Sequence, residues 1–403
     1  MTCKEKILSD NFYDIIVDNP LSPEMMENYD MCYTSIDEVY NFLYVNRTGI
    51  PPLNENFIEY RNIPNLYGLM QFTASVGEQS VFDSNNLIKS GILQIQRSPL
   101  NLTGKGVVLC FIDTGINYAE NVFRDQDGNS RILAIWDQTI QDGTPPEGFL
   151  YGTEYTRQEI NNALQEEDPY AVLSSRDTNG HGSALAAVAA GSILGGGYEY
   201  IGAAPDADIL VIKLKEAKSY LKDFYHVPEN VPAYQENDIM LAVDYAQRFV
   251  EYTSRPVVIC LGLGTNMGNH AGDSPLSVYL TLVSARRNVA VLVCGGNEGN
   301  AAHHFRGRLA KRNDGAVSGE SVEVRVGENC RGFYMELWGI IPDSYNLTIR
   351  SPGGEMISPL RLSVSQSITY SFVYEKSRVT IASSFIEATS GEQLIRFRFT
   401  EPT

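Results

Sequence analysis

The stretch VVLCFIDTGINY, residues 107–118, is an apolar run that stops abruptly at Asp113-Thr114-Gly115. An apolar run followed by a turn tripeptide predicts a buried strand whose carboxyl end carries a carboxylate. In an open parallel sheet, ligands bind beyond the carboxyl ends of the strands. The position of Asp113 therefore indicates a functional site at that edge of the sheet.

The surrounding sequence predicts an α/β fold. Apolar runs alternate with helix-like segments from Gly106 to about Gly299, which favours a parallel sheet with helices on both faces. The predicted strands are Val107–Ile112, Ile209–Leu214, Val257–Leu261 and Val289–Cys294, and the predicted helices include Ser183–Ala190 and Ile239–Phe249.

The segments on either side of this core follow other patterns. Residues 1–70 predict a small α+β unit, with strand-like runs at Tyr13–Val17 and Val39–Val45, a helix from Ser22 and a turn at Pro51-Pro52. From about Val317 the apolar period changes to two, which predicts an antiparallel β-sandwich. The alternating apolar residues are Val322, Val324 and Val326, then Ile395, Phe397 and Phe399.

Two further motifs place polar side chains where a crevice would lie. In DTNGHGSALAAVAAGS, residues 177–192, Asp177 or Asn179 can cap a helix that begins near His181 and is rich in small residues. In VAVLVCGGNEGN, residues 289–300, a buried strand opens into a glycine pair and presents the Asn297 carboxamide, a donor suited to an oxyanion. Each motif alone is typical of an ordinary turn, but the ordered set of Asp, His and Asn indicates a catalytic site.

These three motifs resemble those of the subtilisin-like serine proteases. The resemblance covers about residues 90–305 and implies that Asp113 is the acidic triad residue, His181 the general base and Asn297 the oxyanion-hole side chain. It also implies that Gly262-Leu263-Gly264 pairs with the substrate main chain. One departure is Ser183, where the family usually has Thr, and another is a long insertion between Asp113 and His181.

Three other segments resemble the germination-specific subtilases of clostridial spores: SRILAIWDQT (130–139), YGTEYT (151–156) and GNEGNAAHHFRG (296–307). This resemblance implies a self-processing enzyme that activates a protein zymogen such as a spore cortex-lytic enzyme. Residues 1–70 would be a prodomain, a chaperone and inhibitor left in the cleft after a cut near Tyr67 to Phe72. Residues 71–310 would be the N-terminal part of the catalytic domain, and 311–403 an incomplete, inserted, jelly-roll-like β-sandwich.

The nucleophile is the missing part of this interpretation. The family's Gly-Thr-Ser tripeptide does not occur in the sequence, and Ser390 in ATSGE precedes an alternating strand, which is typical of a loop. We therefore expect the catalytic Ser beyond Thr403 and the chain to be truncated at its C-terminus.

Two alternative functions make different demands on the sequence. An aspartic protease needs two Asp-Thr/Ser-Gly loops that share a proton, and the sequence has one. The second alternative is a catalytically inactive relative that acts as a germination receptor or binding protein, and the sequence is consistent with it.

Composition limits the partners. With a net charge of −18 and no Lys/Arg-rich stripe, the chain is not expected to bind nucleic acid. A polar N-terminus and the lack of a long apolar segment predict neither a signal peptide nor a membrane span, so the protein would be made in the cytoplasm, and the resemblance suggests the spore. Its six cysteines lie far apart and are expected to be reduced thiols.

No cofactor is expected to be required. His303-His304 lacks nearby carboxylate or cysteine ligands, and Cys294 is expected to pack within its strand rather than act as a nucleophile. Calcium stabilises many subtilases, so a structural calcium ion fits the resemblance, but no metal ligands can be assigned from the sequence.

Overall fold

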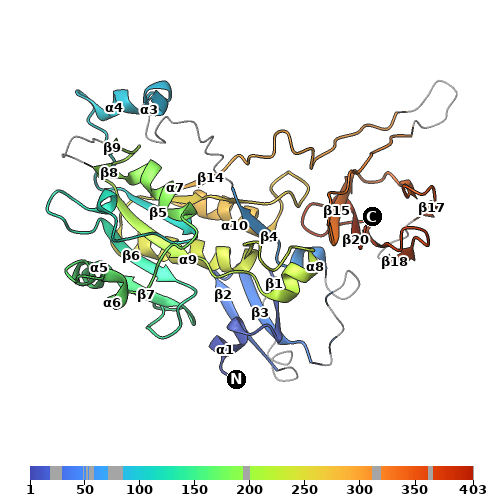
Figure 1. Ribbon diagram of the computed structural model, residues 1–403, viewed down its shortest axis with the longest axis horizontal. Coiled ribbons are helices and arrows are strands. Elements are labelled where there is room, and N and C mark those ends of the chain that lie inside the picture. The colour runs from blue at the N-terminus through green and yellow to red at the C-terminus, as the bar shows by residue number, and fades with distance from the viewer. Residues whose placement is uncertain are drawn as a thin grey trace.

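The computed structural model describes residues 1–18, 30–48, 50, 53, 59–70, 85–193, 200–310, 319–361 and 366–402. Its centre is a six-stranded sheet in the order β14-β12-β5-β10-β6-β7 (Figure 1). The strands run parallel except β7, which pairs antiparallel with β6 at one edge. Their bounds are β5 (Val108–Asp113), β6 (Ile132–Asp137), β7 (Thr153–Thr156), β10 (Asp208–Lys213), β12 (Val257–Leu261) and β14 (Val289–Val293).

Helices cover both faces of this sheet, as the sequence predicts. Alternate residues of β5 enter two different cores, because successive side chains of a strand point to opposite faces. Ile112 packs in the core beneath α9 (Glu236–Thr253) and α10 (Pro275–Ser284). Phe111 packs in the opposite core, beneath α5 (Arg157–Ala163) and α7 (His181–Ala190).

Short elements connect the sheet and its helices. They are α3 (Asn85–Lys89), α4 (Ile92–Gln96), η2 (Asn121–Phe123), α6 (Pro169–Val172), β8 (Ser192–Ile193), β9 (Tyr200–Ile201), α8 (Ser219–Phe224), β11 (Tyr234–Gln235) and β13 (Leu263–Gly264).

The N-terminal unit is a three-stranded antiparallel sheet, β1-β3-β2, that packs against α9 and α10 (Figure 1). Its turn residue Asp37 accepts a hydrogen bond from the Tyr279 hydroxyl at 2.9 Å and pairs with Arg286 at 2.9 Å. Its buried Asp14 pairs with Lys218 at 2.5 Å. The elements are α1 (Cys3–Leu8), β1 (Phe12–Val17), β2 (Met31–Ile36), β3 (Tyr40–Asn46), η1 (Tyr60–Asn62) and β4 (Leu66–Leu69). The helix expected from Ser22 and the turn at Pro51-Pro52 lie outside the described residues.

The expectation that all six cysteines are reduced thiols is wrong for two of them. Cys3 and Cys32 form a disulfide, with their Cα atoms 5.7 Å apart. The packing of α1 beside β2 brings these residues within the range that a disulfide spans. Cys110, Cys260, Cys294 and Cys330 are free thiols.

The C-terminal unit is antiparallel. A four-stranded sheet, β15-β20-β19-β18, lies with the pair β16-β17 around a core that includes Val379, Ile395 and Phe397. The prediction of a strand at Val322–Val326 is wrong: no strand among the described residues pairs with this segment, and Val322 is 51% exposed, so its alternating apolar residues do not face a core. The strands are β15 (Gly332–Gly339), β16 (Asn346–Arg350), β17 (Met356–Arg361), β18 (Gln366–Ser371), β19 (Arg378–Ser384) and β20 (Gln393–Thr400).

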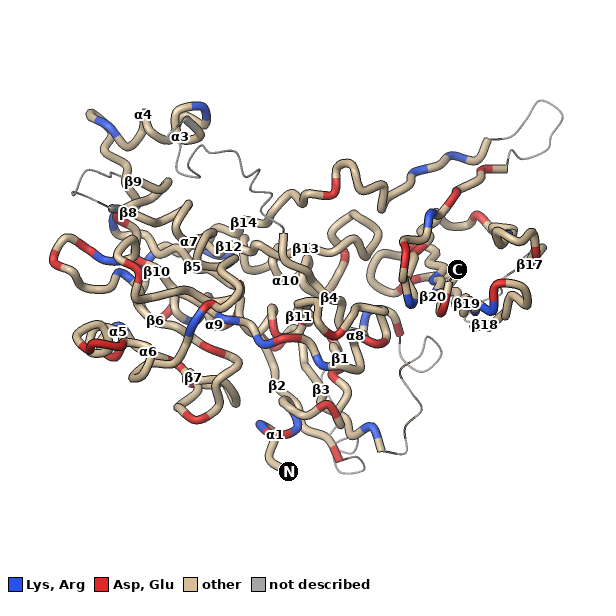
Figure 2. The backbone as a smooth tube through the Cα atoms, in the orientation of Figure 1, with Lys and Arg blue, Asp and Glu red and all other residues tan. Residues whose placement is uncertain are grey.

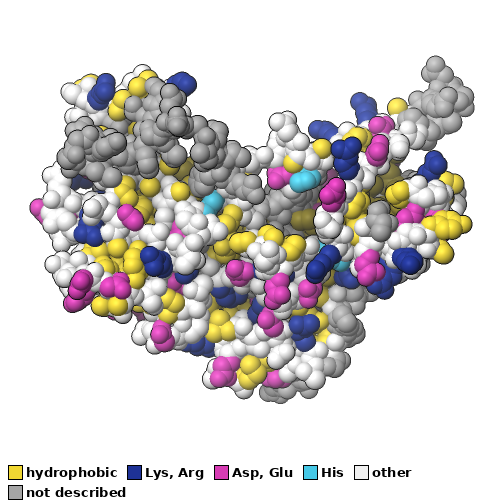
Figure 3. Space-filling view, viewed as in Figure 1, with side chains coloured by type: hydrophobic (Ala, Val, Ile, Leu, Met, Phe, Trp, Pro, Cys, Tyr) yellow, Lys and Arg dark blue, Asp and Glu magenta, His cyan; other side chains and the backbone are white. Residues whose placement is uncertain are grey.

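Charges of both signs are spread over the fold. Lys and Arg occur together with Asp and Glu over most of the backbone in Figure 2, and they are interspersed on the face shown in Figure 3. Among the described residues, no helix is both long and apolar enough to cross a membrane.

Candidate active site

Asp113 and His181 meet at the carboxyl end of the sheet. Asp113 is the last residue of β5 and His181 the first of α7. His181 Nδ1 lies 2.8 Å from Asp113 Oδ1, and both residues are buried. Because a carboxylate only accepts hydrogen bonds, His181 Nδ1 carries the proton in this pair. The contact fixes the ring and leaves Nε2 available for a second partner.

The N-cap of α7 is Gly180, neither Asp177 nor Asn179 as the sequence suggests, but Asp177 holds the first turn of the helix through its side chain. Its carboxylate accepts hydrogen bonds from the Ser183 N–H at 2.8 Å and the Ser183 hydroxyl at 2.7 Å. It also accepts from the Thr114 hydroxyl at 2.9 Å, which ties the helix to the turn after β5. A Cβ on Gly182 would lie 2.3 Å from the Gly115 carbonyl oxygen, so only glycine allows this approach. Ser183 stands where the family that the sequence resembles usually has Thr, and its hydroxyl makes a hydrogen bond to Asp177 that a Thr hydroxyl could also make.

The N-terminal unit reaches the same edge of the sheet through β4, which fills the space between β11 and β13 that we call the cleft. β4 pairs antiparallel with β11 on one side and with β13 on the other. Beyond β4, the Met70 N–H donates to the Gly262 carbonyl oxygen at 3.2 Å, and Leu69 lies opposite Leu263. The Met70 carbonyl oxygen lies 2.7 Å from His181 Nε2. This strand is thus held by main-chain bonds and ends at the histidine.

The two contacts of His181 set its charge. A carbonyl oxygen and a carboxylate can only accept, so both ring nitrogens donate when both bonds form, and the ring is then an imidazolium. Burial, the largest influence, lowers the pKa of His181. The hydrogen bond and charge of Asp113, with the Met70 carbonyl and Asp177, outweigh it and raise the pKa above its ordinary 6.5.

Glycines leave room around these groups. A Cβ on Gly262 would lie 2.7 Å from Asp113 Oδ2 and 3.1 Å from His181 Cε1. A Cβ on Gly264 would lie 2.8 Å from Met70 Cε, so the absence of a side chain there accommodates the Met70 side chain. The sequence singles out both glycines, but it does not show that their neighbours would be these atoms.

A pocket of about 270 Å³ adjoins β4. Its lining combines Tyr67 of β4 with apolar residues of the α/β core, among them Ile239, Leu263 and Leu276. The Tyr67 side chain is buried, which raises the pKa of its hydroxyl well above the usual value. An aromatic side chain of β4 therefore borders a pocket that polar residues such as Asn269 and Asp273 also line.

Asn297 follows β14 on the same side of the sheet, two strands from β5 in the sheet order, and its side chain is exposed. The Cys294 thiol before it donates to the Leu263 carbonyl oxygen at 3.2 Å, and burial raises its pKa. A raised pKa keeps the thiol neutral, which argues against a nucleophile. The expectation that no carboxylate lies near His303-His304 is wrong, because His303 pairs with Glu298 at 2.5 Å. Within the described ranges, no three His, Cys, Asp or Glu residues are grouped to hold a metal.

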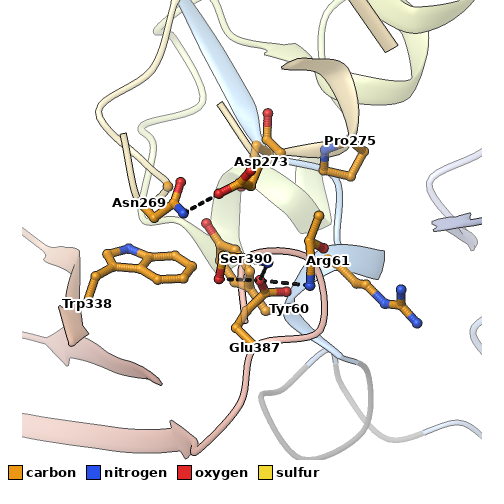
Figure 4. Close-up of a pocket in the computed structure, with 12 residues that line it drawn as sticks. Tyr60, Arg61, Asn269, Asp273, Pro275, Trp338, Glu387 and Ser390 are labelled. Atoms are coloured by element: carbon orange, nitrogen blue, oxygen red, sulfur yellow. Dashed lines mark hydrogen bonds between the residues drawn. The ribbon is translucent and has the colours of Figure 1, made fainter. Parts of the chain in front are cut away.

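A second pocket, of about 20 Å³, lies where the three parts of the chain meet (Figure 4). Tyr60 of η1 and Trp338 of β15 approach edge to face with ring centroids 5.7 Å apart. Glu336 accepts from the Gly268 N–H at 2.8 Å and from Trp338 Nε1 at 3.0 Å. These contacts join the C-terminal unit to both the N-terminal unit and the core.

Comparisons with known proteins show the family to which the chain is similar. The family model Peptidase_S8, the subtilase family, matches residues 104–326. The solved structure of the Clostridium perfringens CspB protease is similar, with a TM-score of 0.66 and 26% identity over 79% of this chain. The match covers 61% of that structure's chain, so the present chain spans less than two thirds of its length. Sphericase matches at 22% identity and a TM-score of 0.33, over 52% of this chain and 53% of its own. No curated protein matches.

Proposed function

Because the chain belongs to the subtilase family, we propose that it is a serine endopeptidase whose Asp113 and His181 are the acid and base of a catalytic triad. The observation that carries this proposal is the 2.8 Å contact between their side chains, with His181 Nε2 facing a peptide carbonyl at 2.7 Å. Asp113 holds the ring with its proton on Nδ1. His181 takes the proton of a serine hydroxyl as that oxygen attacks the peptide carbonyl.

The nucleophile in this proposal is a Ser encoded after Thr403, since no Gly-Thr-Ser occurs in residues 1–403. The exposed apolar side chains of β14 support a continuation of the catalytic domain: Leu292 is 57% and Val293 63% exposed at the edge of the described sheet. Asn297 would donate its carboxamide N–H to the oxyanion. In enzymes of this type such a contact lowers the barrier by about 2.7–4 kcal/mol.

Residues 1–70 are, in this proposal, a prodomain that the enzyme cuts from itself. The supporting observation is that β4 occupies the cleft as a third strand between β11 and β13, with its main chain running to His181. The bond cut would be Met70–Gln71, within the range expected from the sequence; Gln71 and Phe72 lie outside the described residues. With its carbonyl on His181, the cut end competes with added substrate for the cleft and keeps the base protonated while it is bound.

The same proposal assigns the other two domains of the chain. Residues 71–310 are the N-terminal part of the catalytic domain, and residues 311–403 are an inserted β-sandwich that braces the prodomain and the core through Glu336 and Trp338. The substrate is a protein, and by resemblance to the clostridial enzymes it is a cortex-lytic zymogen in spores.

Substitution of the base tests the proposal. In the full-length protein, we expect His181→Ala to abolish both release of the N-terminal unit and hydrolysis of peptides ending in Gly-Leu-Met. The exposed His304 offers a matched control, because His304→Ala should leave both reactions unchanged. Hydrolysis that survives in His181→Ala would refute the assigned role. A wild-type protein that binds these peptides without cutting them would favour the inactive, binding relative instead.

A further inference from the structure

Glu236 is a fully buried carboxylate in the cleft wall. It is the first residue of α9 and follows β11, the strand that pairs with β4. Acidic residues in the first turn of a helix are usually solvated and favoured by the helix dipole. Here the side chain points inward and is completely inaccessible, so its charge must be satisfied by protein groups.

Both carboxylate oxygens of Glu236 accept main-chain hydrogen bonds. Oε2 accepts from the Asn65 N–H at 3.0 Å, and Oε1 accepts from the Leu276 N–H at 2.9 Å. Leu276 lies in the first turn of α10, where the N–H groups lack helical partners. Glu236 also donates its own N–H to the Asn65 carbonyl oxygen at 3.0 Å.

Glu236 thus hydrogen-bonds both main-chain polar groups of one residue, Asn65. Asn65 is the sixth residue back from the proposed cut after Met70, counting Met70 as the first. Its N–H and its C=O are both bound by Glu236, and the Tyr225 hydroxyl lies 3.4 Å from its side-chain oxygen. Main-chain bonds of this kind do not depend on the Asn65 side chain, so another peptide in the cleft could make them.

We infer that Glu236 is a specificity-determining residue that binds the main chain of the sixth substrate residue before the cut, and makes cleavage depend on substrates that extend that far. The inference rests on the proposed endopeptidase function. Burial raises the pKa of Glu236 to about 7, against the lowering effect of the Asn65 and Leu276 donors. A substrate N–H at this position therefore supplies one of the two bonds that compensate the buried charge.

Three peptides test the inference on the self-processed full-length enzyme. They are the acetylated coumarin amides of Asn-Leu-Tyr-Gly-Leu-Met, of the same hexapeptide with an N-methylated Asn, and of Tyr-Gly-Leu-Met. Methylation removes the N–H donor without changing the enzyme. A hydrogen bond to a charged group strengthens binding by a factor of about ten or more. We therefore expect kcat/KM for the N-methyl peptide to fall about tenfold, mainly through KM.

The variant Glu236→Gln should lower kcat/KM for the unmodified hexapeptide by about tenfold, because one N–H then faces an amide NH₂ group. It should leave the N-methyl and tetrapeptide substrates unchanged, whereas a merely structural role would lower all three together. Glu229→Gln, at an exposed site, is the charge-matched control.

Equal rates on the hexapeptide and its N-methyl form would overturn the inference and leave the proposed function standing. This comparison uses only the wild-type enzyme, so it holds even if Glu236→Gln does not fold. No hydrolysis of any peptide by the wild type would overturn the proposed function and the inference with it.

Discussion

Replacing Gly262 with Ala should disturb the pair of Asp113 and His181 directly. The added Cβ would lie 2.7 Å from Asp113 Oδ2, 3.0 Å from Leu185 Cδ2 and 3.1 Å from His181 Cε1. All three neighbours are buried or partly buried, and two of them are the proposed catalytic side chains. The perturbation therefore reaches the site without removing any of its functional groups.

The magnitude follows from these distances. Ordinary contact lies near 3.5–4.0 Å between carbon atoms, so each neighbour must retreat by roughly 0.4–0.8 Å. Overpacking of this size destabilises a protein by about 1–3 kcal/mol. A displaced Asp113 also weakens its bond to His181, now 2.8 Å, so the pKa of His181 should fall. A misplacement approaching 1 Å in a catalytic site costs about 10²-fold in rate.

Three measurements check this prediction in the full-length protein. NMR titration of the His181 ring gives its pKa, urea unfolding gives the stability, and peptide hydrolysis gives kcat/KM. Gly295→Ala is the control, because a Cβ there meets nothing within 4 Å. A Gly262→Ala protein with wild-type stability and an unchanged His181 pKa would refute the packing on which this reasoning depends.

Other changes test separate parts of the site. Asp113→Asn should slow peptide hydrolysis by about 10⁴-fold, the loss known for this change in another serine protease. Because the pKa of His181 is raised above 6.5, the acid limb of self-processing should lie above pH 6.5. The stability that protonated His181 contributes should be complete below pH 6.5 and lost as pH rises through its raised folded pKa, which urea unfolding at several pH values would measure. Gly264→Ala should slow cleavage after Met70, and Met70→Ala should restore it, as followed by gel electrophoresis. Alkylation of the unfolded, unreduced protein should label four of the six cysteines, and labelling of all six would contradict the disulfide.

The sequence predicts the core of this fold well because its strands are long apolar runs between turn residues. β5 and β12 begin and end within one residue of their predicted bounds. The contact of Asp113 with His181 also follows from the sequence, since a strand end and a helix start meet at the same edge of a parallel sheet. Its geometry depends on glycines such as Gly182, whose neighbours appear only in three dimensions.

Other features depend on contacts between distant segments. The sequence treats Ile132–Asp137 as part of an insertion, yet it is a strand of the main sheet because β10 pairs with it. The alternation at Val322–Val326 predicts a strand, but no partner strand lies beside it in the described residues. Glu236 carries no signal of burial, because acidic residues at helix starts are usually exposed. Its role depends on Asn65, which is distant in sequence.

In the proposed function, the strand that ends at Met70 is the product of the enzyme's own His181-dependent reaction. N-terminal sequencing and intact mass of the purified full-length protein test it most directly. We predict a new N-terminus at Gln71 in the wild type, and only uncut chain in His181→Ala. A wild-type protein that begins only at Met1 or Thr2, or a His181→Ala variant that still yields Gln71 as its first residue, would contradict the claim.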